Sequence, residues 1–357
     1  MNALGERIAS LIGAQGPLSV AQFMTIALHD PQAGYYATHE AIGARGDFIT
    51  APEVSQMFGE LLGLWLVQTW QDQGAPSPAR LLELGPGRGT LMADALRAAR
   101  LKPEFLAAME IVLVESSPIL RKIQEEALAP SGLKIAWAAQ FDAGLADKPL
   151  FLLANEFFDA LPVRQYVRTD RGWCERMVVA REGKLAFAPS PVPTAISIPA
   201  ARGQPEAGAI YEVSPAAGAL AEEIAQAIAA RGGAALITDY GYAEAGFGET
   251  LQAVGRHCFA DVLEAPGDAD ISAHVNFAEI ANAAQDAKAA VFGPVNQGAF
   301  LLRLGIGERA ARLKRANRAL ADVIDAAVRR LTDPQDMGTL FKALAIVPNG
   351  APTPPGF

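Results

Sequence analysis

Residues 81–90 contain three alternate glycines at a point where an apolar strand is expected to turn into a helix. Gly85, Gly87 and Gly89 have no Cβ, so their backbone can lie close to a flat cofactor at the carboxyl end of the strand. The spacing is G-x-G-x-G, whereas dinucleotide-binding proteins use G-x-G-x-x-G. Pro86 also removes one backbone N–H that a pyrophosphate would use.

Glu83 favours a cofactor that carries an amino group. It stands two residues before the first glycine, where a carboxylate attracts an ammonium and repels a diphosphate. S-adenosylmethionine, which contains an amino acid, fits this pattern best. A plain strand-to-helix turn is the alternative, because short glycine motifs often arise by chance. The apolar spacing of residues 81–84 and 91–97 is typical of a strand followed by a helix, and this context favours the cofactor site.

Two further acidic residues follow the next two expected strands. Ligands of open α/β sheets bind beyond the carboxyl ends of the strands. Glu115 is therefore predicted to accept hydrogen bonds from both ribose hydroxyls of an adenosine. Asp142 could accept a hydrogen bond from the adenine amino group, and a role as a helix N-cap is an equal alternative.

The fourth expected strand runs directly into the polar and aromatic sequence ANEFFDALP at residues 154–162. Carboxylates hold a planar guanidinium through paired hydrogen bonds and can keep a nitrogen lone pair directed at a methyl group. We therefore predict that Glu156 and Asp159 hold such a substrate and that Asn155 lies beside them at the cofactor. Each residue alone also has a structural interpretation, in which Asp159 caps a turn and Asn155 satisfies backbone groups.

Composition excludes several classes of function. The 357 residues include 39 acidic and 30 basic residues, which gives a net charge of −9, and the basic residues form no cluster in the sequence, so nucleic acid is not an expected partner. Cys174 and Cys258 form no C-x-x-C pair and the four histidines show no ligand spacing, so neither a disulfide framework nor a metal site is expected. The chain has no apolar run that could span a bilayer and no signal or transit pattern, which predicts a cytoplasmic protein without membrane insertion.

The order of the expected elements predicts an α/β fold with a doubly wound, parallel sheet, because strands and helices alternate. Residues 1–78 are expected to form a helical region with one turn-rich loop, and residues 79–162 and 232–357 the cofactor-binding core. Residues 163–231 break the alternation and predict an inserted β-meander and a helix. The expected strands are 80–84, 110–115, 133–137, 150–154 and 234–239 in the core and 163–168, 174–180 and 184–188 in the meander; the expected N-terminal helices are 4–12, 20–28 and 56–70.

Other segments have simpler interpretations. Residues 308–331 predict a solvated amphipathic helix. Tyr35, Tyr36 and Phe48 are candidates for the wall of a substrate channel, although aromatic residues near a loop often only pack it down. His257 and His274 are candidate proton acceptors, although structural histidines are more common.

These motifs resemble the MidA-like S-adenosylmethionine-dependent methyltransferases, whose mitochondrial members are complex I assembly factors that dimethylate an arginine of a peripheral-arm subunit. The resemblance extends over nearly the whole chain and includes GDFITAPEVS (46–55), FGE (58–60), ELGPGRGT (83–90), ANEFFDALP (154–162), DYG (239–241), DISAHVNF (270–277), and MG with FK at 337–342. Asn276 departs from the family, which more often has aspartate there, so the family gives it no role. The chain begins close to the conserved fold without a mitochondrial leader, which indicates a bacterial protein.

The resemblance implies a Rossmann-like, class I S-adenosylmethionine-dependent methyltransferase that modifies arginine in a protein such as a complex I subunit. It also implies that Glu83, Gly85, Gly87, Gly89, Glu115 and Asp142 surround the cofactor and that the loop at 47–55 closes over it. An open groove between the helical N-terminal region and the meander would suit a protein substrate, and a closed pocket a small molecule. A nucleic-acid methyltransferase is disfavoured by the acidic charge and by Asn-Glu-Phe-Phe in place of Asn-Pro-Pro-aromatic. A non-catalytic complex I assembly chaperone would keep the fold without turnover.

Overall fold

The chain folds around one large sheet whose strands read as apolar runs. This computed structural model describes residues 1–38, 50–196, 198, 205–255 and 258–357. The sheet has eight strands in these residues: β15 (Ala289–Asn296), β16 (Phe341–Pro348), β10 (Gly233–Tyr242), β5 (Leu150–Asn155), β2 (Ala79–Leu84), β3 (Met109–Val114) and β4 (Ile135–Ala138) in this order, with β14 (Val275–Asn276) beside β10. The five predicted core strands are confirmed within two or three residues at each end.

The sheet is not parallel throughout, and this corrects the prediction. β16 runs antiparallel to both of its neighbours, β10 and β15. The apolar runs of β15 and β16 lie beyond the last strand that the sequence analysis assigned. An antiparallel strand needs no crossover helix, so the alternation of strands and helices carries no signal for it.

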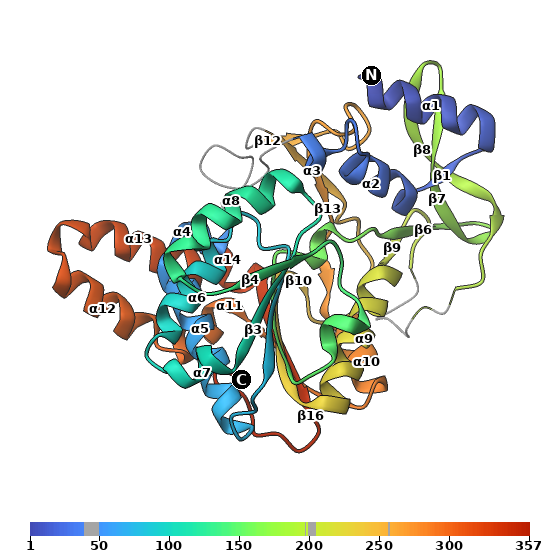
Figure 1. Ribbon diagram of the computed structural model, residues 1–357. Helices are drawn as coiled ribbons and strands as arrows, with labels where there is room; N and C mark the ends of the chain where they lie inside the picture. Colours follow the sequence, from blue (N-terminus) through green and yellow to red (C-terminus); the bar gives the residue numbers. More distant parts are fainter. Residues whose placement is uncertain (39–49, 197, 199–204, 256–257) are drawn as a thin grey trace.

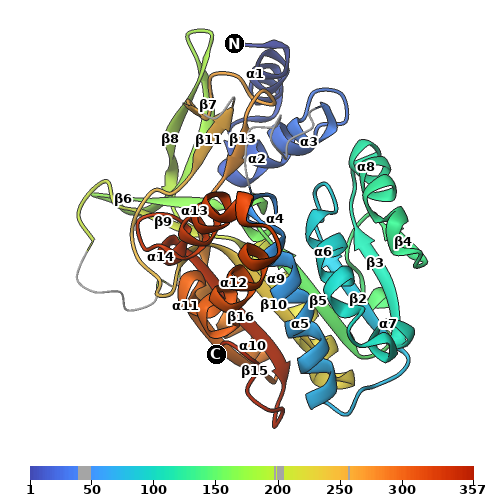
Figure 2. The same ribbon diagram turned by 90° about the vertical axis from the view of Figure 1, so that its left-hand side faces the viewer.

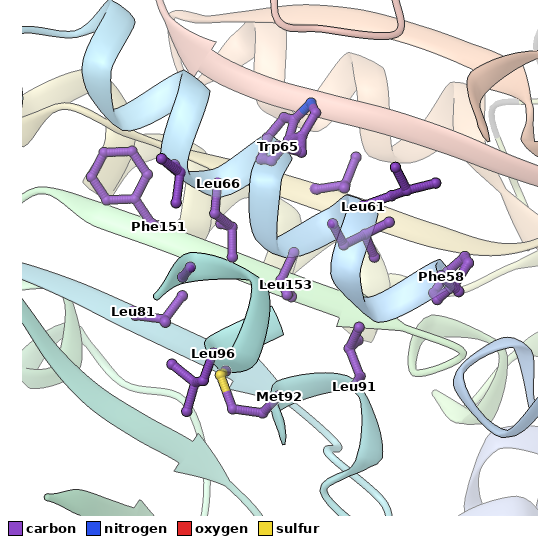
Figure 3. Close-up of a cluster of buried hydrophobic side chains, with 14 of the residues drawn as sticks. Phe58, Leu61, Trp65, Leu66, Leu81, Leu91, Met92, Leu96, Phe151 and Leu153 are labelled. Atoms are coloured by element: carbon purple, nitrogen blue, oxygen red, sulfur yellow. The ribbon is translucent and has the colours of Figure 1, made fainter. Parts of the chain in front are cut away.

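Helices cover both faces of the sheet (Figure 2), and one layer places the glycine-rich turn. Helix α5 (Gln56–Asp72) packs on α6 (Thr90–Ala99), which begins directly after that turn. Gly63 makes the close approach possible, because a Cβ there would lie 2.5 Å from the backbone oxygen of Ala95. Figure 3 shows the apolar side chains of α5 and α6 meeting those of β2 and β5 in a common cluster. Burying each large aliphatic side chain stabilises the fold by roughly 1.5–3 kcal/mol.

The opposite face of the sheet is covered by α9 (Pro215–Arg231) and α10 (Phe277–Asp286). Further helices lie along the described chain. They are α3 (Tyr35–Thr38), α4 (Ala51–Val54), α7 (Pro103–Ala108), α8 (Pro118–Leu128), α11 (Gln297–Arg303) and α14 (Met337–Leu340), with the 3-10 helices η1 (Ala129–Ser131), η2 (Ala143–Ala146) and η3 (Phe158–Ala160). No helix of the described residues is both long enough and apolar enough to cross a membrane.

A second body lies beyond the carboxyl edge of the large sheet (Figure 1). It contains an antiparallel sheet of β1 (Leu18–Ser19), β6 (Arg164–Thr169), β7 (Gly172–Arg181), β8 (Lys184–Pro193) and β9 (Ile210–Val213). The predicted meander strands are confirmed as β6, β7 and β8, and β8 is longer than expected. A smaller sheet of β11 (Gln252–Gly255), β12 (Cys258–Ala260) and β13 (Asp270–Ser272) joins them.

The apolar core of this second body changes the predicted grouping of segments. Helices α1 (Ala3–Gln15) and α2 (Val20–His29) pack there with residues of the meander and of β11 and β13, whereas α4 and α5 pack on the large sheet. The helices of residues 1–78 therefore serve two cores, and residues 252–272 leave the core to which the sequence assigned them. The reason is that three segments far apart in the sequence share one apolar interior.

Residues 306–332 form a helical hairpin and not the single helix that the sequence predicts. Helices α12 (Ile306–Ala316) and α13 (Ala321–Thr332) are separated by the 3-10 helix η4 (Arg318–Leu320). The side chain of Asn317 accepts a hydrogen bond from the backbone N–H of Ala319 and caps η4, which ends α12. The hairpin projects from the left side of the core in Figure 1.

Candidate functional site

The glycine-rich turn separates two cavities at the carboxyl edge of the sheet. Gly85 and Gly87, with φ angles of +58° and +54°, line both cavities. Gly89 also has a positive φ, of +82°, but it lines neither of these two cavities. A Cβ on Gly89 would meet Gln124 at 3.5 Å. The third glycine is the N-cap of α6, and contact between Gly89 and the cofactor stays a prediction.

The larger cavity, of about 310 Å³, has the character of an adenosine site. Its wall is mainly apolar and includes Leu84, Val114 and Phe141, and Glu115 lies at the end of β3. The Glu115 carboxylate accepts a hydrogen bond from the backbone N–H of Ser117 at 2.8 Å. Burial raises the pKa of Glu115, and the hydrogen bonds that it accepts oppose this rise.

Gln124 on α8 forms hydrogen bonds to residues around this cavity, a role that was not predicted from the sequence. Its Nε2 donates hydrogen bonds to the backbone oxygen of Gly87 at 2.8 Å and to Glu115 at 3.1 Å. Its Oε1 accepts one from Trp137 Nε1 at 2.8 Å. Gln124 stands four residues after Leu120 and four before Leu128, on the face of α8 that is otherwise apolar, and a polar residue at that spacing is the signal in the sequence, although it does not show which residues Gln124 contacts.

The smaller cavity, of about 30 Å³, contains the strongest electrostatic signal for a cofactor. Glu83 is 2 % exposed, its Oε2 has no hydrogen-bond partner among the described residues, and burial raises its pKa to about 8. Pro86, Thr90 and Asn155 also line this cavity. An ammonium group would give Glu83 the partner that it lacks. The residues present thus fit the amino acid end of S-adenosylmethionine, with its adenosine in the larger cavity.

Asp142 is exposed, and its carboxylate accepts hydrogen bonds from the backbone N–H groups of Gly144 and Leu145. The capping alternative is therefore confirmed. Its neighbours Gln140 and Phe141 form the cavity wall there, and contact between Asp142 and an adenine stays a prediction.

Glu156 lines both cavities, as Gly85 and Gly87 of the glycine turn do. Its Oε1 accepts hydrogen bonds from the backbone N–H of Ala51 at 2.8 Å and from Asn155 Nδ2 at 3.1 Å. Burial raises the pKa of Glu156 to about 7, and Arg330 is close enough to lower it. Its φ of +49° is unfavourable for a residue with a Cβ. Such strain at a strand end facing a cavity is typical of functional positions.

Asn155 and Asp159 support Glu156 in different ways. Asn155 Oδ1 accepts a hydrogen bond from Thr238 at 2.8 Å, so the amide that contacts Glu156 is fixed on both sides. Asp159 accepts a hydrogen bond from the Tyr240 hydroxyl at 2.6 Å, and its Oδ1 is buried without a partner among the described residues. Burial raises the pKa of Asp159. Asp159 lines neither of the two cavities, and its charge raises the pKa of Glu156.

Asp239 completes this acidic group, and its role was not predicted. One of its oxygens accepts the backbone N–H groups of Phe157, Phe158 and Asp159 at 3.0 to 3.2 Å, and the other accepts that of Tyr240 at 2.9 Å. Burial, Asp159 and Glu156 raise the pKa of Asp239.

The aromatic and histidine candidates divide between wall and core. Tyr36 and His29 line the larger cavity, and the Tyr36 hydroxyl donates to Asp270 at 2.9 Å. Tyr35 is fully buried in the second body. His274 packs edge-on against Tyr240, and burial lowers its pKa.

Two other candidates and part of the covering loop lie outside the described residues. These are Phe48, His257 and residues 47–49 of the loop. Of the described part of that loop, Thr50, Pro52 and Glu53 line the smaller cavity. Asn276 caps α10 by accepting the backbone N–H of Glu279.

The strand order, the glycine turn and the unpaired Glu83 define a class I S-adenosylmethionine-dependent methyltransferase. The model of a family described as S-adenosyl-L-methionine-dependent methyltransferases matches residues 61–295, and the chain belongs to this family.

Relatives and a solved structure agree with this class. The chain is 37% identical to the mitochondrial protein arginine methyltransferase NDUFAF7 of Danio rerio, over 96% of this chain and 86% of that protein. It is 38% identical to the protein of the same name from Rattus norvegicus, over 95% and 83%. A Burkholderia thailandensis protein solved with S-adenosylhomocysteine bound superposes with a TM-score of 0.85 at 28% identity, over 99% of this chain and 94% of that one.

We expect Glu83→Gln to weaken S-adenosylmethionine binding by roughly 1.5–3 kcal/mol, because a neutral amide cannot pair with the ammonium. The raised pKa of Glu83 also costs stability as pH rises from about 4.5 to about 8, because over this range the unfolded chain releases the proton that the folded chain keeps. The ligand-free variant should therefore lose less stability than the wild type over this range. Calorimetry and denaturant unfolding measure the two effects, and unchanged affinity would exclude Glu83 from the cofactor site.

Gly87→Ala and Gly89→Ala form a matched pair. Each places a Cβ on a residue with positive φ, which costs about 1–2 kcal/mol of stability. We expect only Gly87→Ala to lose S-adenosylmethionine affinity as well, because Gly87 lines both cavities and Gly89 neither. Thermal unfolding first measures the stability of both variants, and titration with S-adenosylmethionine then measures the difference in affinity. Equal losses of affinity would contradict the division of roles.

Proposed function

We propose that this enzyme transfers methyl groups from S-adenosylmethionine to an arginine of a protein substrate, such as a peripheral-arm subunit of complex I, in the bacterial cytoplasm. The observation that supports this most strongly is the placement of Glu156 between the two cavities. A carboxylate there can hold a guanidinium beside the reactive end of the cofactor. The names of the relatives, protein arginine methyltransferases, agree with this substrate class.

Bound S-adenosylmethionine supplies an activated methyl group on a positively charged sulfur. The task of the protein is then to orient the acceptor and to balance charge. Ala51 and Asn155 fix one oxygen of Glu156, and Oε2 accepts no hydrogen bond within the described part of the chain. That oxygen is available to a guanidinium. We propose that Asp159 and Asp239 add negative potential behind it, with Tyr240 fixing Asp159.

The second body supports a substrate larger than a metabolite in this proposal. Its α3 residue Tyr36 forms part of the wall of the larger cavity, so the second body meets the core at the site. We propose that the inserted meander faces the substrate from there. A small-molecule methyltransferase remains the second candidate, because the larger cavity by itself could hold more than the adenosine.

Glu156→Gln should keep S-adenosylmethionine affinity within about twofold and reduce methyl transfer about 100-fold or more, because the amide keeps the shape but not the charge that orients the guanidinium. The measurements are calorimetry and mass spectrometry of complex I subunits from cells that lack the wild-type gene and carry the variant. Glu125→Gln, an exposed change on α8, is the control.

Full restoration of arginine methylation by Glu156→Gln would exclude the proposed grip. Loss of both cofactor binding and methylation would place Glu156 in the cofactor site instead. Restored complex I assembly without methylation of any subunit would favour the assembly chaperone.

The ionised form of Glu156 is the one that holds a cation, so methylation should depend on pH. Because burial raises the pKa of Glu156 to about 7, we expect kcat/KM for the protein substrate to rise with pH through this value and then to level off. The residual activity of Glu156→Gln should lack this rise. A wild-type profile that is flat between about pH 6 and 8 would contradict the assignment.

A further inference from the structure

The helical hairpin of residues 306–332, here called the basic hairpin, has a charge opposite to that of the whole chain. It contains seven cationic and three anionic residues, although the net charge of the protein is −9. Five of these cations stand within residues 309–318, so the expectation that the basic residues form no cluster in the sequence is wrong. The fold brings the remaining cations close to these, since α12 and α13 pack against each other as one projecting element (Figure 1).

Most of these cations have no structural use within the protein. Arg309 fixes the base of the hairpin, because its guanidinium donates two hydrogen bonds to Glu60 of α5, and Lys314 pairs with Asp325 across the hairpin. The others are exposed. Among the residues that the structure describes, five have no ion pair or hydrogen bond through their side chains: Arg312, Arg315, Arg318, Arg329 and Arg330.

The exposed surface of the hairpin also includes large apolar side chains. Leu320 is 47 % and Val323 65 % exposed, and their spacing of three residues places them close together. These two side chains are separate from the apolar face by which the hairpin packs on the protein, because the residues of that face, Ile306, Ala310 and Leu331, are buried in the main core. Exposed apolar groups framed by arginines are typical of surfaces that bind other proteins.

The hairpin lies beside the proposed active site. Helix α13 packs on α4, whose Ala51 donates its backbone N–H to Glu156. Arg330 of α13 is close enough to Glu156 to lower its pKa. A partner held on the outer surface of the hairpin would therefore be tethered next to the carboxylates.

We propose that the basic hairpin is the docking surface for an acidic segment of the protein substrate that also carries apolar side chains. This rests on the proposed function in one respect, namely that the substrate is a protein. An anionic membrane or a nucleic acid fits less well. The rest of the surface is strongly acidic and would be repelled by either, and the hairpin's continuous apolar stripe is already buried in the core.

The test begins with the full chain in cells, in which Val323 is replaced by the photo-cross-linking residue benzoylphenylalanine. We expect irradiation to join it to one protein through a segment with more acidic than basic residues, identified by mass spectrometry. Cross-links to lipid or nucleic acid, to a basic segment, or to no partner would overturn the proposal.

The captured protein is then purified and titrated against two charge-reversal variants of equal size. The hairpin variant is Arg312→Glu with Arg315→Glu and Arg318→Glu. The control variant is Lys122→Glu with Lys134→Glu and Arg231→Glu, which are exposed residues on other elements. We expect the hairpin variant to bind on the order of tenfold or more weakly and the control variant within about twofold, with both keeping their S-adenosylmethionine affinity.

Equal weakening in both variants would show that only the net charge matters and would overturn the proposal, as would binding of the wild type to vesicles of phosphatidylglycerol that the hairpin variant loses. The outcomes for docking and for methylation are separable. A captured protein that binds through the hairpin but is never methylated supports docking and contradicts the proposed function. A methylated protein whose KM is the same for the hairpin variant as for the wild type supports the proposed function and contradicts docking on the hairpin.

Discussion

The site depends on one buried carboxylate, Asp239, which accepts three successive backbone N–H groups from the turn after β5. These groups follow Glu156 directly, and its left-handed φ is compatible with the fold only because the turn beyond it is held in place. Since β10 pairs with β5 along its length, the strand that carries Asp239 also sets the height of Glu156 above the sheet. Loss of this interaction would release the carboxylate from both cavities at once.

Several acids buried within a short distance of one another are costly unless a cation arrives. Burial raises the pKa values of Glu83, Glu156, Asp159 and Asp239. A structural role alone would favour apolar replacements at such positions. The buried carboxylates become more stable when ligands bring positive charge. Two such cations are expected, the ammonium of the cofactor for Glu83 and a guanidinium for Glu156. In the proposed function, the enzyme thus gives up stability in its ligand-free form to bind two cations.

The sequence predicted the parts of this design that local patterns encode. Apolar runs located the five core strands, and polar residues at strand ends indicated Glu83, Glu115 and Glu156, which the structure places beside the two cavities. Contacts between distant residues were not predictable in the same way. Asp239 lies 82 residues from Phe157, and neither residue signals the other in the sequence. Gln124 reaches the glycine turn from another helix, and Gly87 and Gly89 differ in that only Gly87 lines the two cavities. The antiparallel β16 and the three-segment core of the second body likewise depend on tertiary packing.

In the proposed function, charge is distributed so that the protein substrate is oriented before it is modified. The carboxylates at the carboxyl edge attract a guanidinium, whereas the basic hairpin beside them attracts the opposite sign. A substrate with its arginine next to an acidic segment satisfies both at once, and the reversed orientation would place like charges together at both sites. Since Glu60 binds Arg309 of the hairpin and Arg97 of α6, the hairpin is fixed to the same helix that begins at the glycine turn. The distance between docking surface and cofactor is therefore set by packed elements, which is what positioning catalysis requires.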